Sequence, residues 1–494
     1  MKKLLSIILL IVLVSTIFIA CGDSGGTGDG NSVTTTTASG DGTETTIAEE
    51  TEPEGDKPDF DITDSDYEGA EFKIIYPEWS LYNNFYFAEE ANGEAMNDAI
   101  YERTSKIEED LNIDIVPYTI GYIETILPEV RKTVLAGMDE YDLALTHCAT
   151  ELTAYVSDSL VMNWNKIPVI DMDKPYWNSS LKDTIESSGM LAFAANDFIL
   201  PDVNTIFFNK TILGDLSLED PYGLVNSGKW TWDKLIEMST NASRDINGDG
   251  VFDDQDQYGF VGEIGWQFSS IITGCDQYLI EIQNGTPVLA VNTDRMVSII
   301  EKIFSMLKNG NIAFTWNYAS EYDPNNNGTP PVDFNEGRAL YYLVPLSLAS
   351  HFRAMDVEFG ILPMPKFNDT QENYVSLNWA GYMCVPMTAS DLEFTGKVVE
   401  LLGYYNSTIV KPAFYDILLG QKITRDEESM RMLDIVFDGA VYDLGVVIGI
   451  HGMTDTVLKG DGNFVSYHDK NEKTWNNSIT KYATACEEYM QYNG

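Results

Sequence analysis

Side chains that carry oxygen recur at nearly alternate positions in one twelve-residue segment, residues 245–256. In the helix-loop-helix calcium loop, oxygen ligands come from positions 1, 3, 5, 7, 9 and 12, and a glycine at position 6 makes the sharp turn. This segment has glycine at position 6, and it predicts a structural Ca²⁺ site. The predicted ligands are Asp245, Asn247, Asp249, the backbone carbonyl of Val251, Asp253 and Asp256.

The last position of this loop is Asp256, where calcium sensors carry Glu. A shorter side chain pulls the loop tighter or leaves room for a water, so a structural clip is favoured over a switch. The alternative is an acidic turn rich in Asp and Asn that binds no metal.

Residues for catalysis are sparse. The chain has four histidines and neither an HExxH motif nor a glycine-rich phosphate loop. Its 77 acidic residues make some pair of carboxylates at a catalytic separation almost inevitable, so such a pair says nothing by itself. We therefore predict that the protein is not an enzyme, with a surface glycoside hydrolase as the less favoured alternative.

Charge and composition restrict the function further. Lys and Arg total 30, and the formal net charge of -47 repels nucleic acid and anionic head groups. The 494 residues are 44% hydrophobic and 12% aromatic, enough for a substantial core and, as a first expectation, two lobes. The five cysteines form no CxxC pair, and only Cys21 lies in an informative context.

The N-terminus has the pattern of an exported chain. Two lysines precede an apolar run that ends at Ala20, which predicts a signal peptide over residues 1–20. The run FIACG around Cys21 resembles the lipobox of bacterial lipoproteins, so Cys21 is the predicted lipidation site; the alternative is an ordinary signal peptide with an incidental cysteine. Residues 21–66 are polar and acidic with few large apolar side chains, and they predict a flexible tether.

Strands and helices alternate beyond the tether. Apolar and β-branched runs predict strands at 71–76, 113–118 and 141–146. Apolar residues at helical spacing predict helices over 95–111, near 123–136 and at 151–157. This order indicates an α/β fold with an open, mainly parallel sheet.

Several segments, in this order, resemble the family 1 extracellular solute-binding proteins, which include maltose- and oligosaccharide-binding proteins. They are MNDAIYERTSKIEEDLNIDI, MDEYDLAL, FFNK, FNEGRALYYL and FGILPMPKF, and the resemblance covers nearly everything from about Tyr67 onward.

The resemblance implies a two-lobed, periplasmic-binding-protein-like fold of type II, with a hinge and a cleft between the lobes. Lobe 1 is then 67–203 plus about 366–408, and lobe 2 is 204–358 plus about 409–494, with the calcium-type loop 245–256 in lobe 2. The chain crosses between lobes near 202–205, near 359–365 and around 385–408.

The family pattern also implies ligand contacts, because a carbohydrate cleft needs aromatic rings beside carboxylates and amides. In lobe 1 it points to Trp79 and Tyr82 after the first strand. It also points to His147, although a lone histidine is more often structural, and to Asp202, for which a hinge turn is an equal alternative.

In lobe 2 the pattern points to Glu263 and Trp266. Trp379 and Trp475 are further candidate rings, although core packing is the more common role of a tryptophan at such positions.

The implied function is binding of an extracellular solute, an oligosaccharide being favoured, and its delivery to the permease subunits of an ABC transporter. The expected protein is a monomer anchored by lipid at the outer face of the bacterial cell membrane, or periplasmic if there is an outer membrane. The alternative is a surface sensor or adhesin for the same class of ligand.

Overall fold

A computed structural model describes residues 65–78, 83–148, 150, 152–263, 267–316, 334, 336–347, 357–419, 427–450, 452, 457 and 460–493. The predicted signal peptide, Cys21 and nearly all of the tether lie outside these residues. Residues 55–494 belong to one compact unit, and the description below concerns that unit alone.

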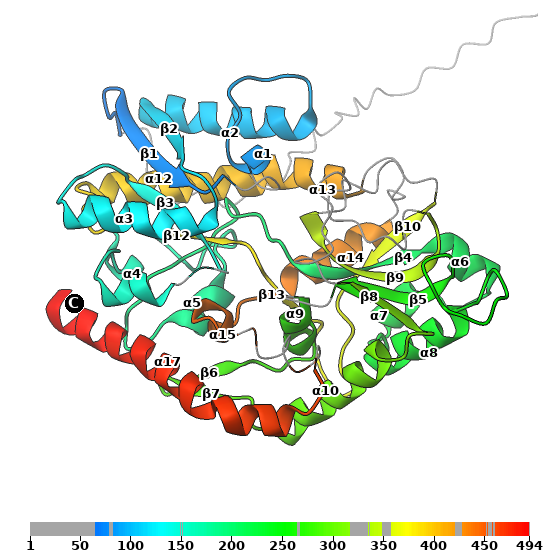
Figure 1. The fold of residues 1–494 in the computed structure, drawn as a ribbon. Coiled ribbons are helices and arrows are strands. Elements are labelled where there is room, and N and C mark those ends of the chain that lie inside the picture. The colour runs from blue at the N-terminus through cyan, green and yellow to red at the C-terminus, as the bar shows by residue number, and fades with distance from the viewer. Residues whose placement is uncertain are drawn as a thin grey trace, which may run out of the picture. The chain divides into compact units, whose positions relative to one another are not determined.

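The first of two main sheets has the strand order β12-β3-β1-β2 (Figure 1). Its strands are β1 (Ala70–Tyr76), β2 (Ile113–Thr119), β3 (Leu143–His147) and β12 (Gly381–Cys384). β1 pairs in parallel with β2 and with β3, as the predicted alternation of strands and helices requires, whereas β12 is antiparallel to β3. The predicted strands at 71–76, 113–118 and 141–146 are confirmed.

Helices cover this sheet where apolar residues recur at helical spacing. α2 (Ala95–Leu111), which connects β1 to β2, buries Ile100, Ile107 and Leu111. The helix predicted near 123–136 begins with a 3-10 turn (η1, Ile123–Thr125) and continues as α3 (Ile126–Leu135). The remaining elements of this part are α1 (Asn83–Tyr86), α4 (Thr153–Ser157), η2 (Trp164–Lys166), α5 (Ser179–Ile185), α12 (Leu392–Tyr405), a π-helical turn η5 (Asn406–Val410) and α13 (Lys411–Leu419).

A buried arginine on α2 joins these elements. The guanidinium of Arg103 donates 2.8 Å to Oδ1 of Asn406 and also donates to the carbonyl of Tyr86. It lies 5.0 Å from the ring centroid of Phe198 and 5.8 Å from that of Phe87. Burial lowers its pKa to about 9, and the two ring faces help to accommodate the charge.

The second main sheet is mixed and has the order β10-β4-β9-β5-β8. Its strands are β4 (Asn204–Asn209), β5 (Tyr258–Glu263), β8 (Ala313–Trp316), β9 (Ala339–Pro345) and β10 (Phe359–Leu362). β4 is antiparallel to β9 and β10, and β5 is parallel to β8 and β9. Every described residue of β4 and β9 is buried, which is expected for central strands covered on both faces.

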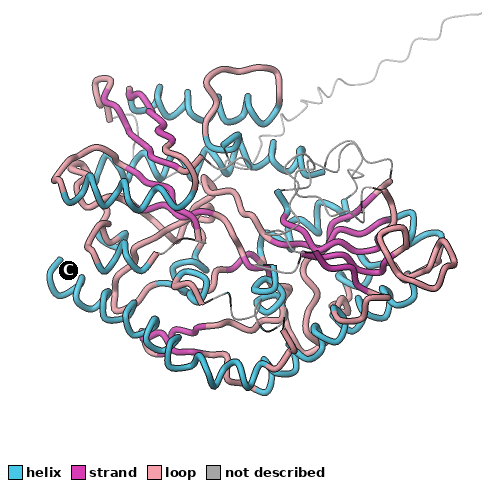
Figure 2. The backbone as a smooth tube through the Cα atoms, viewed as in Figure 1, coloured by secondary structure: helices cyan, strands magenta, loops and turns pink. Residues whose placement is uncertain are grey.

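Further helices and two small sheets complete the chain. The helices are α6 (Lys210–Asp215), α7 (Pro221–Asn226), α8 (Trp232–Ala242), α9 (Gln267–Gly274), α10 (Asp294–Leu307), α14 (Glu427–Asp438) and α15 (Leu444–Val447). The small sheets are β6 (Ile280–Gln283) with β7 (Thr286–Leu289), and β11 (Ser376–Leu377) with β13 (Ala440–Val441). The second sheet packs against α6, α7, α8, α10 and α14, whereas α9 contacts β11, and α15 contacts α5 and β6. The C-terminal helix α17 (Phe464–Asn493) contacts α4, α10 and β7, and Figure 2 shows it as the long helix along the lower side.

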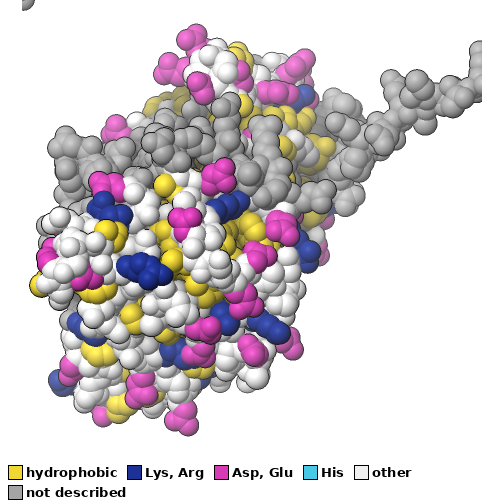
Figure 3. All heavy atoms as spheres, turned by 90° about the vertical axis from the view of Figure 1, so that its right-hand side faces the viewer, with side chains coloured by type: hydrophobic (Ala, Val, Ile, Leu, Met, Phe, Trp, Pro, Cys, Tyr) yellow, Lys and Arg dark blue, Asp and Glu magenta, His cyan; other side chains and the backbone are white. Residues whose placement is uncertain are grey.

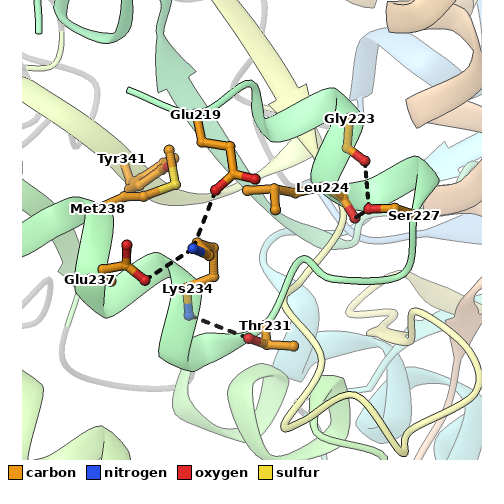
Figure 4. Close-up of polar contacts among 9 residues, drawn as sticks. All are labelled: Glu219, Gly223, Leu224, Ser227, Thr231, Lys234, Glu237, Met238 and Tyr341. Carbon is orange, nitrogen blue, oxygen red and sulfur yellow. Dashed lines mark hydrogen bonds and ion pairs between the residues drawn. The ribbon is translucent and has the colours of Figure 1, made fainter. Parts of the chain in front are cut away.

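The start of α8 illustrates how local sequence fixes a helix (Figure 4). The hydroxyl of Thr231 caps the helix by accepting from the backbone N–H of Lys234 at 3.3 Å. The Lys234 ammonium lies 3.2 Å from the Glu219 carboxylate and 3.0 Å from that of Glu237. At the buried face, the Tyr341 hydroxyl of β9 donates 3.3 Å to the sulfur of Met238, which ties α8 to the sheet.

Charged side chains of both signs lie on the surface of the described part of the chain. Figure 3 shows Lys and Arg side chains interspersed with Asp and Glu on one face. None of the helices among the described residues is long and apolar enough to cross a membrane.

A glycine in β5 tests the packing of α8 on the second sheet. A Cβ added at Gly259 would lie 2.0 Å from the backbone oxygen of Ser239 in α8. We expect Gly259→Ala to lower the free energy of unfolding by about 1–3 kcal/mol, because backbone must move. Urea denaturation measures this, with Gly214→Ala as the control, since no atom lies within 4 Å of the Cβ added there. Equal stability of the two variants would contradict the packing described here.

Candidate ligand-binding site

Three of the predicted ligand-binding residues meet where the chain passes between the two main sheets. His147 is the last residue of β3, Asp202 lies just before β4, and Trp379 lies between β11 and β12. All three are buried, with exposed fractions of 5%, 3% and 4%. The fold therefore brings together residues that are far apart in the sequence, and the candidate site is built around them.

Two segments cross between the main sheets here: residues 202–203, which lead into β4, and residues 378–380, which lead into β12 and form the return crossing. Backbone and side-chain hydrogen bonds join them directly. The N–H of Trp379 donates 2.9 Å to the carbonyl of Asp202. The N–H of Asp202 donates 2.9 Å to Oδ1 of Asn378, which also accepts 3.0 Å from the N–H of Ala380. A carboxylate oxygen of Asp202 accepts from the N–H of Ser347 at 3.3 Å. Asp202 thus fixes its own crossing segment to the segment at 378–380 and to Ser347, just after β9.

A serine of α9 extends this network into the second sheet. The hydroxyl of Ser270 accepts 2.9 Å from Nε1 of Trp379 and 2.6 Å from Nδ2 of Asn204. On the other side, Nδ2 of Asn378 donates 2.9 Å to the hydroxyl of Tyr442. We name the group made by Asp202, Asn378, Trp379, Ser270, Asn204 and Tyr442 the crossing cluster.

Four members of the crossing cluster were not predicted from the sequence: Asn204, Ser270, Asn378 and Tyr442. The available signal was the run NWAGY at 378–382, in which two polar groups and a glycine interrupt an otherwise apolar segment. A Cβ added at Gly381 would lie 2.7 Å from the carbonyl oxygen of Thr146, so this glycine permits the close approach of β12 to β3.

Burial sets the protonation of the side chains around the crossing cluster. It lowers the pKa of His147 to about 3, although the backbone of Trp379 opposes the shift, so the imidazole is neutral at physiological pH. Burial, with a smaller contribution from Asp202, raises the pKa of Tyr86 well above its ordinary value. The His147 imidazole and the Tyr86 phenol are therefore both neutral at physiological pH.

Two buried polar atoms near the crossings have no hydrogen-bond partner among the described residues. They are Oδ1 of Asn204 and Oγ of Ser347. Buried polar groups are nearly always paired, so each of these atoms calls for a water, a ligand or a neighbouring side chain. Asn204 begins β4, and Ser347 lies two residues after the end of β9.

The other predicted ligand-binding residues are placed as follows. Trp79, Tyr82 and Trp266 lie outside the described residues. Glu263 ends β5, and its side chain is likewise not described. Trp475 is buried in α17. The centroid of its ring lies 5.8 Å from that of the Tyr467 ring and 5.9 Å from that of the His468 ring. Figure 1 shows α17 along the lower side, well apart from β3 and β12.

The predicted calcium loop has a compact conformation. Gly248 and Gly250 adopt positive φ angles of 73° and 84°, as a tight turn requires. The Asp245 carboxylate accepts from the N–H groups of both glycines, at 2.6 and 2.8 Å. The carboxylate of Asp256, which is fully buried, accepts from the N–H groups of Ile246 at 2.9 Å and Asp253 at 3.0 Å.

These residues supply the oxygen donors that Ca²⁺ prefers, on a loop folded back on itself. No three Asp, Glu, His or Cys side chains among the described residues are gathered as a metal site requires, so binding would need the loop carboxylates to move inward.

No family model matches the chain, and no curated protein matches its sequence. Solved structures share its fold. The galacto-N-biose-/lacto-N-biose I-binding protein of an ABC transporter from Bifidobacterium longum, in complex with lacto-N-biose, is 13% identical, with a TM-score of 0.56 over 85% of this chain and 99% of that one.

Two further structures are similar to the same extent. An ABC substrate-binding protein from Listeria monocytogenes, in complex with cycloalternan, is 14% identical with a TM-score of 0.55, over 83% of this chain and 99% of that one. A solute-binding protein from Thermotoga lettingae bound with α-D-tagatose is 12% identical with a TM-score of 0.54, over 83% of this chain and all of that one. The chain has the α/β, two-lobed fold of the periplasmic-binding-protein-like solute-binding proteins, as predicted.

The buried imidazole of His147 gives a pH test. Its pKa is lower in the folded protein than the value near 6.5 of an unfolded histidine, so the folded state favours the neutral ring. This stabilisation is complete above about pH 6.5 and is lost as the pH falls toward 3. We expect the unfolding free energy of the wild type, relative to His147→Gln, to fall by about 2 kcal/mol between pH 6.5 and 5. Denaturant titrations at both pH values measure it; parallel pH profiles would contradict the burial of this ring.

Proposed function

We propose that the protein captures a carbohydrate outside the cell and delivers it to the permease subunits of an ABC transporter. The observation that supports this most is the fold, which is shared with solute-binding proteins whose structures hold lacto-N-biose, cycloalternan and tagatose. The His147 imidazole is neutral at physiological pH, which agrees with an uncharged ligand.

The proposed mechanism is closure of two lobes about the crossings. Hinges need only a few residues that change their backbone angles, provided that the bodies on either side remain rigid. The crossing cluster ties the two crossing segments to each other, so that they bend together, because the Trp379 ring and the Asn378 amide each bridge segments on different elements. A ligand that contacts both lobes then stabilises the closed arrangement.

Within this mechanism, Trp79 and Tyr82 follow the end of β1, and Glu263 and Trp266 lie at the end of β5. The carboxyl ends of parallel strands are where open α/β sheets place ligands. Ring faces at these positions would pack on the apolar faces of a sugar, and the carboxylate would accept bonds from its hydroxyls. His147, Asp202 and Trp379 would form the floor beneath the ligand, whereas the packing of Trp475 gives it no evident route to the ligand.

The proposal also covers export, anchoring, oligomeric state and the calcium-type loop. The signal peptide is removed, Cys21 carries the lipid that anchors the chain at the outer face of the membrane, and residues 22–66 act as a tether. The protein works as a monomer and does no chemistry on its ligand. The loop 245–256 binds Ca²⁺ as a structural clip in the second lobe.

Carbohydrate binding is tested by isothermal titration calorimetry with a panel of mono- and oligosaccharides. We expect one-to-one binding of at least one of them. In Trp266→Ala and Trp79→Ala the Kd should rise about tenfold or more, since a lost stacking ring costs on the order of 1 kcal/mol or more. Tyr492→Ala is the control, because that ring is 77% exposed near the end of α17.

A chain that binds no saccharide, or tryptophan variants that bind as well as the wild type, would overturn the carbohydrate proposal. The sensor and adhesin alternatives bind the same class of ligand. Reconstitution with permease subunits encoded alongside would separate them from an importer.

Calcium binding is tested by thermal unfolding in calcium and in excess chelator. Calcium should raise the Tm by mass action, because it binds the folded loop and not the unfolded chain. Asp249→Asn should remove most of this increase, whereas Asp254→Asn, which changes a residue outside the ligand positions, should retain it. The same Tm in calcium and in chelator would contradict a calcium clip.

A further inference from the structure

The C-terminal helix α17 contacts both of the bodies whose motion the proposed function requires, namely the first and second main sheets with their covering helices. It contacts α4, which follows β3 of the first sheet, and also β7 and α10, of which α10 packs on β8 of the second sheet. Figure 1 shows α4 and α10 near opposite ends of α17. The 30 residues of α17 extend about 45 Å at roughly 1.5 Å per residue, longer than the diameter of a small domain. The helix therefore joins the two bodies, and none of its residues belongs to the crossing cluster.

The second half of α17, residues 479–490, is held on the first body by packing and by hydrogen bonds. Tyr482 is fully buried, and its hydroxyl donates 2.7 Å to the carbonyl of Ile185 in α5. Near the end of the helix, the sulfur of Met490 accepts 3.3 Å from Nδ2 of Asn163. Both partners belong to the segment between β3 and β4, which also makes a β-bridge to β12. This half is therefore anchored to the first body.

The first half of α17, residues 464–475, is held on the second body by apolar packing. Just before it, Gly462 lies against the ring of Phe304 in α10, since a Cβ added at this glycine would be 2.7 Å from Cδ1 of that ring. Phe464 and Trp475 are buried. Among the described residues, no hydrogen bond or ion pair joins this half to β7 or α10. The contact therefore has no directional bonds to keep it closed.

A buried histidine in the first half opposes its docking. His468 is 4% exposed, and its Nε2 has no hydrogen-bond partner among the described residues, while its Nδ1 lies 3.5 Å from the carboxylate of Asp469 on the same helix. A buried polar atom without a partner costs free energy, which water recovers once the atom is exposed. No described residue of the second half carries such an atom.

Motion of the two bodies has to break some of these contacts. Bodies joined at their crossings can rotate apart only if their other contacts separate, and α17 is one such contact; α5 of the first body, which touches β6, β13 and α15, is another. A continuous helix cannot follow two bodies that rotate apart, so one half of α17 must detach. The first half is the one that detaches, because it lacks hydrogen bonds to its body and buries an unpaired nitrogen.

We propose that α17 is a strap that stays on the first body and whose first half docks on the second body only when the lobes are closed. This inference rests on the lobe motion of the proposed function. Docking of the first half opposes opening, so the strap restricts entry and release of the ligand. A free helix of about twelve residues is marginal in water, so the detached half frays.

The test is amide hydrogen exchange, read by mass spectrometry, on the full-length protein without ligand, because exchange reports local opening below global unfolding. In Gly462→Ala the added Cβ meets the Phe304 ring, so residues 468–475 should exchange at least about tenfold faster, while residues 479–490 keep the wild-type rate. Gly137→Ala is the control: it has a similar positive φ, 68° against 73°, and no atom lies within 4 Å of its added Cβ.

A second variant should act in the opposite direction. His468→Leu removes the unpaired nitrogen and should slow exchange at 468–475, whereas Thr474→Leu, at an exposed position of the same half, should not. A saccharide that binds should also slow exchange in the first half and not in the second.

Equal changes in both halves in Gly462→Ala, or faster exchange in His468→Leu, would show that α17 is part of one undivided core and would overturn the proposal. A bound saccharide that leaves exchange of the first half unchanged would overturn it too. The comparison of variants needs no ligand, so failure to bind any saccharide would count against the proposed function and leave the test of docking intact.

Discussion

The amide of one buried side chain, that of Asn378, joins the two segments through which the chain passes between its main sheets. Its oxygen accepts from the backbone of Asp202 and Ala380, and its nitrogen donates to the hydroxyl of Tyr442. Buried polar groups must be paired, so this arrangement is narrowly specified. The positions of β12 beside β3 and of β4 beside β9 depend on it, because both strands start within a few residues of these bonds.

Three strands of the first sheet could be predicted from the sequence, because they are apolar runs joined by helices of clear periodicity. The two-lobed architecture was implied by the family resemblance, and the strands of the second sheet were not predicted individually. The segment 359–365 was predicted as a crossing between lobes. Its first four residues form β10, which pairs with β4 and so still belongs to the second sheet. Prolines at 363 and 365 indicate a change of direction there but do not say on which side of them the strand lies. The next strand of the first sheet is β12, after Ala380.

The site was less accessible to prediction. His147, Asp202 and Trp379 could be named because a family pattern points to them, although no periodicity does. The rest of the network could not be named: Trp379 bonds to Ser270, Ser270 to Asn204, and Asn378 to Tyr442, each across tens of residues or more. Such bonds follow from the fold rather than from local sequence. The burial of Trp475 against Tyr467 and His468 likewise depends on where the long C-terminal helix packs.

The central claim is that two bodies, joined at the crossing cluster, close on a carbohydrate. It is tested most directly by electron-spin distance measurements between labels at Leu135→Cys on α3 and Met430→Cys on α14, both exposed, while the described native cysteines are buried. The account predicts that a saccharide which binds will narrow the distance distribution and shift it to shorter values. An identical distribution with and without that saccharide would contradict the account.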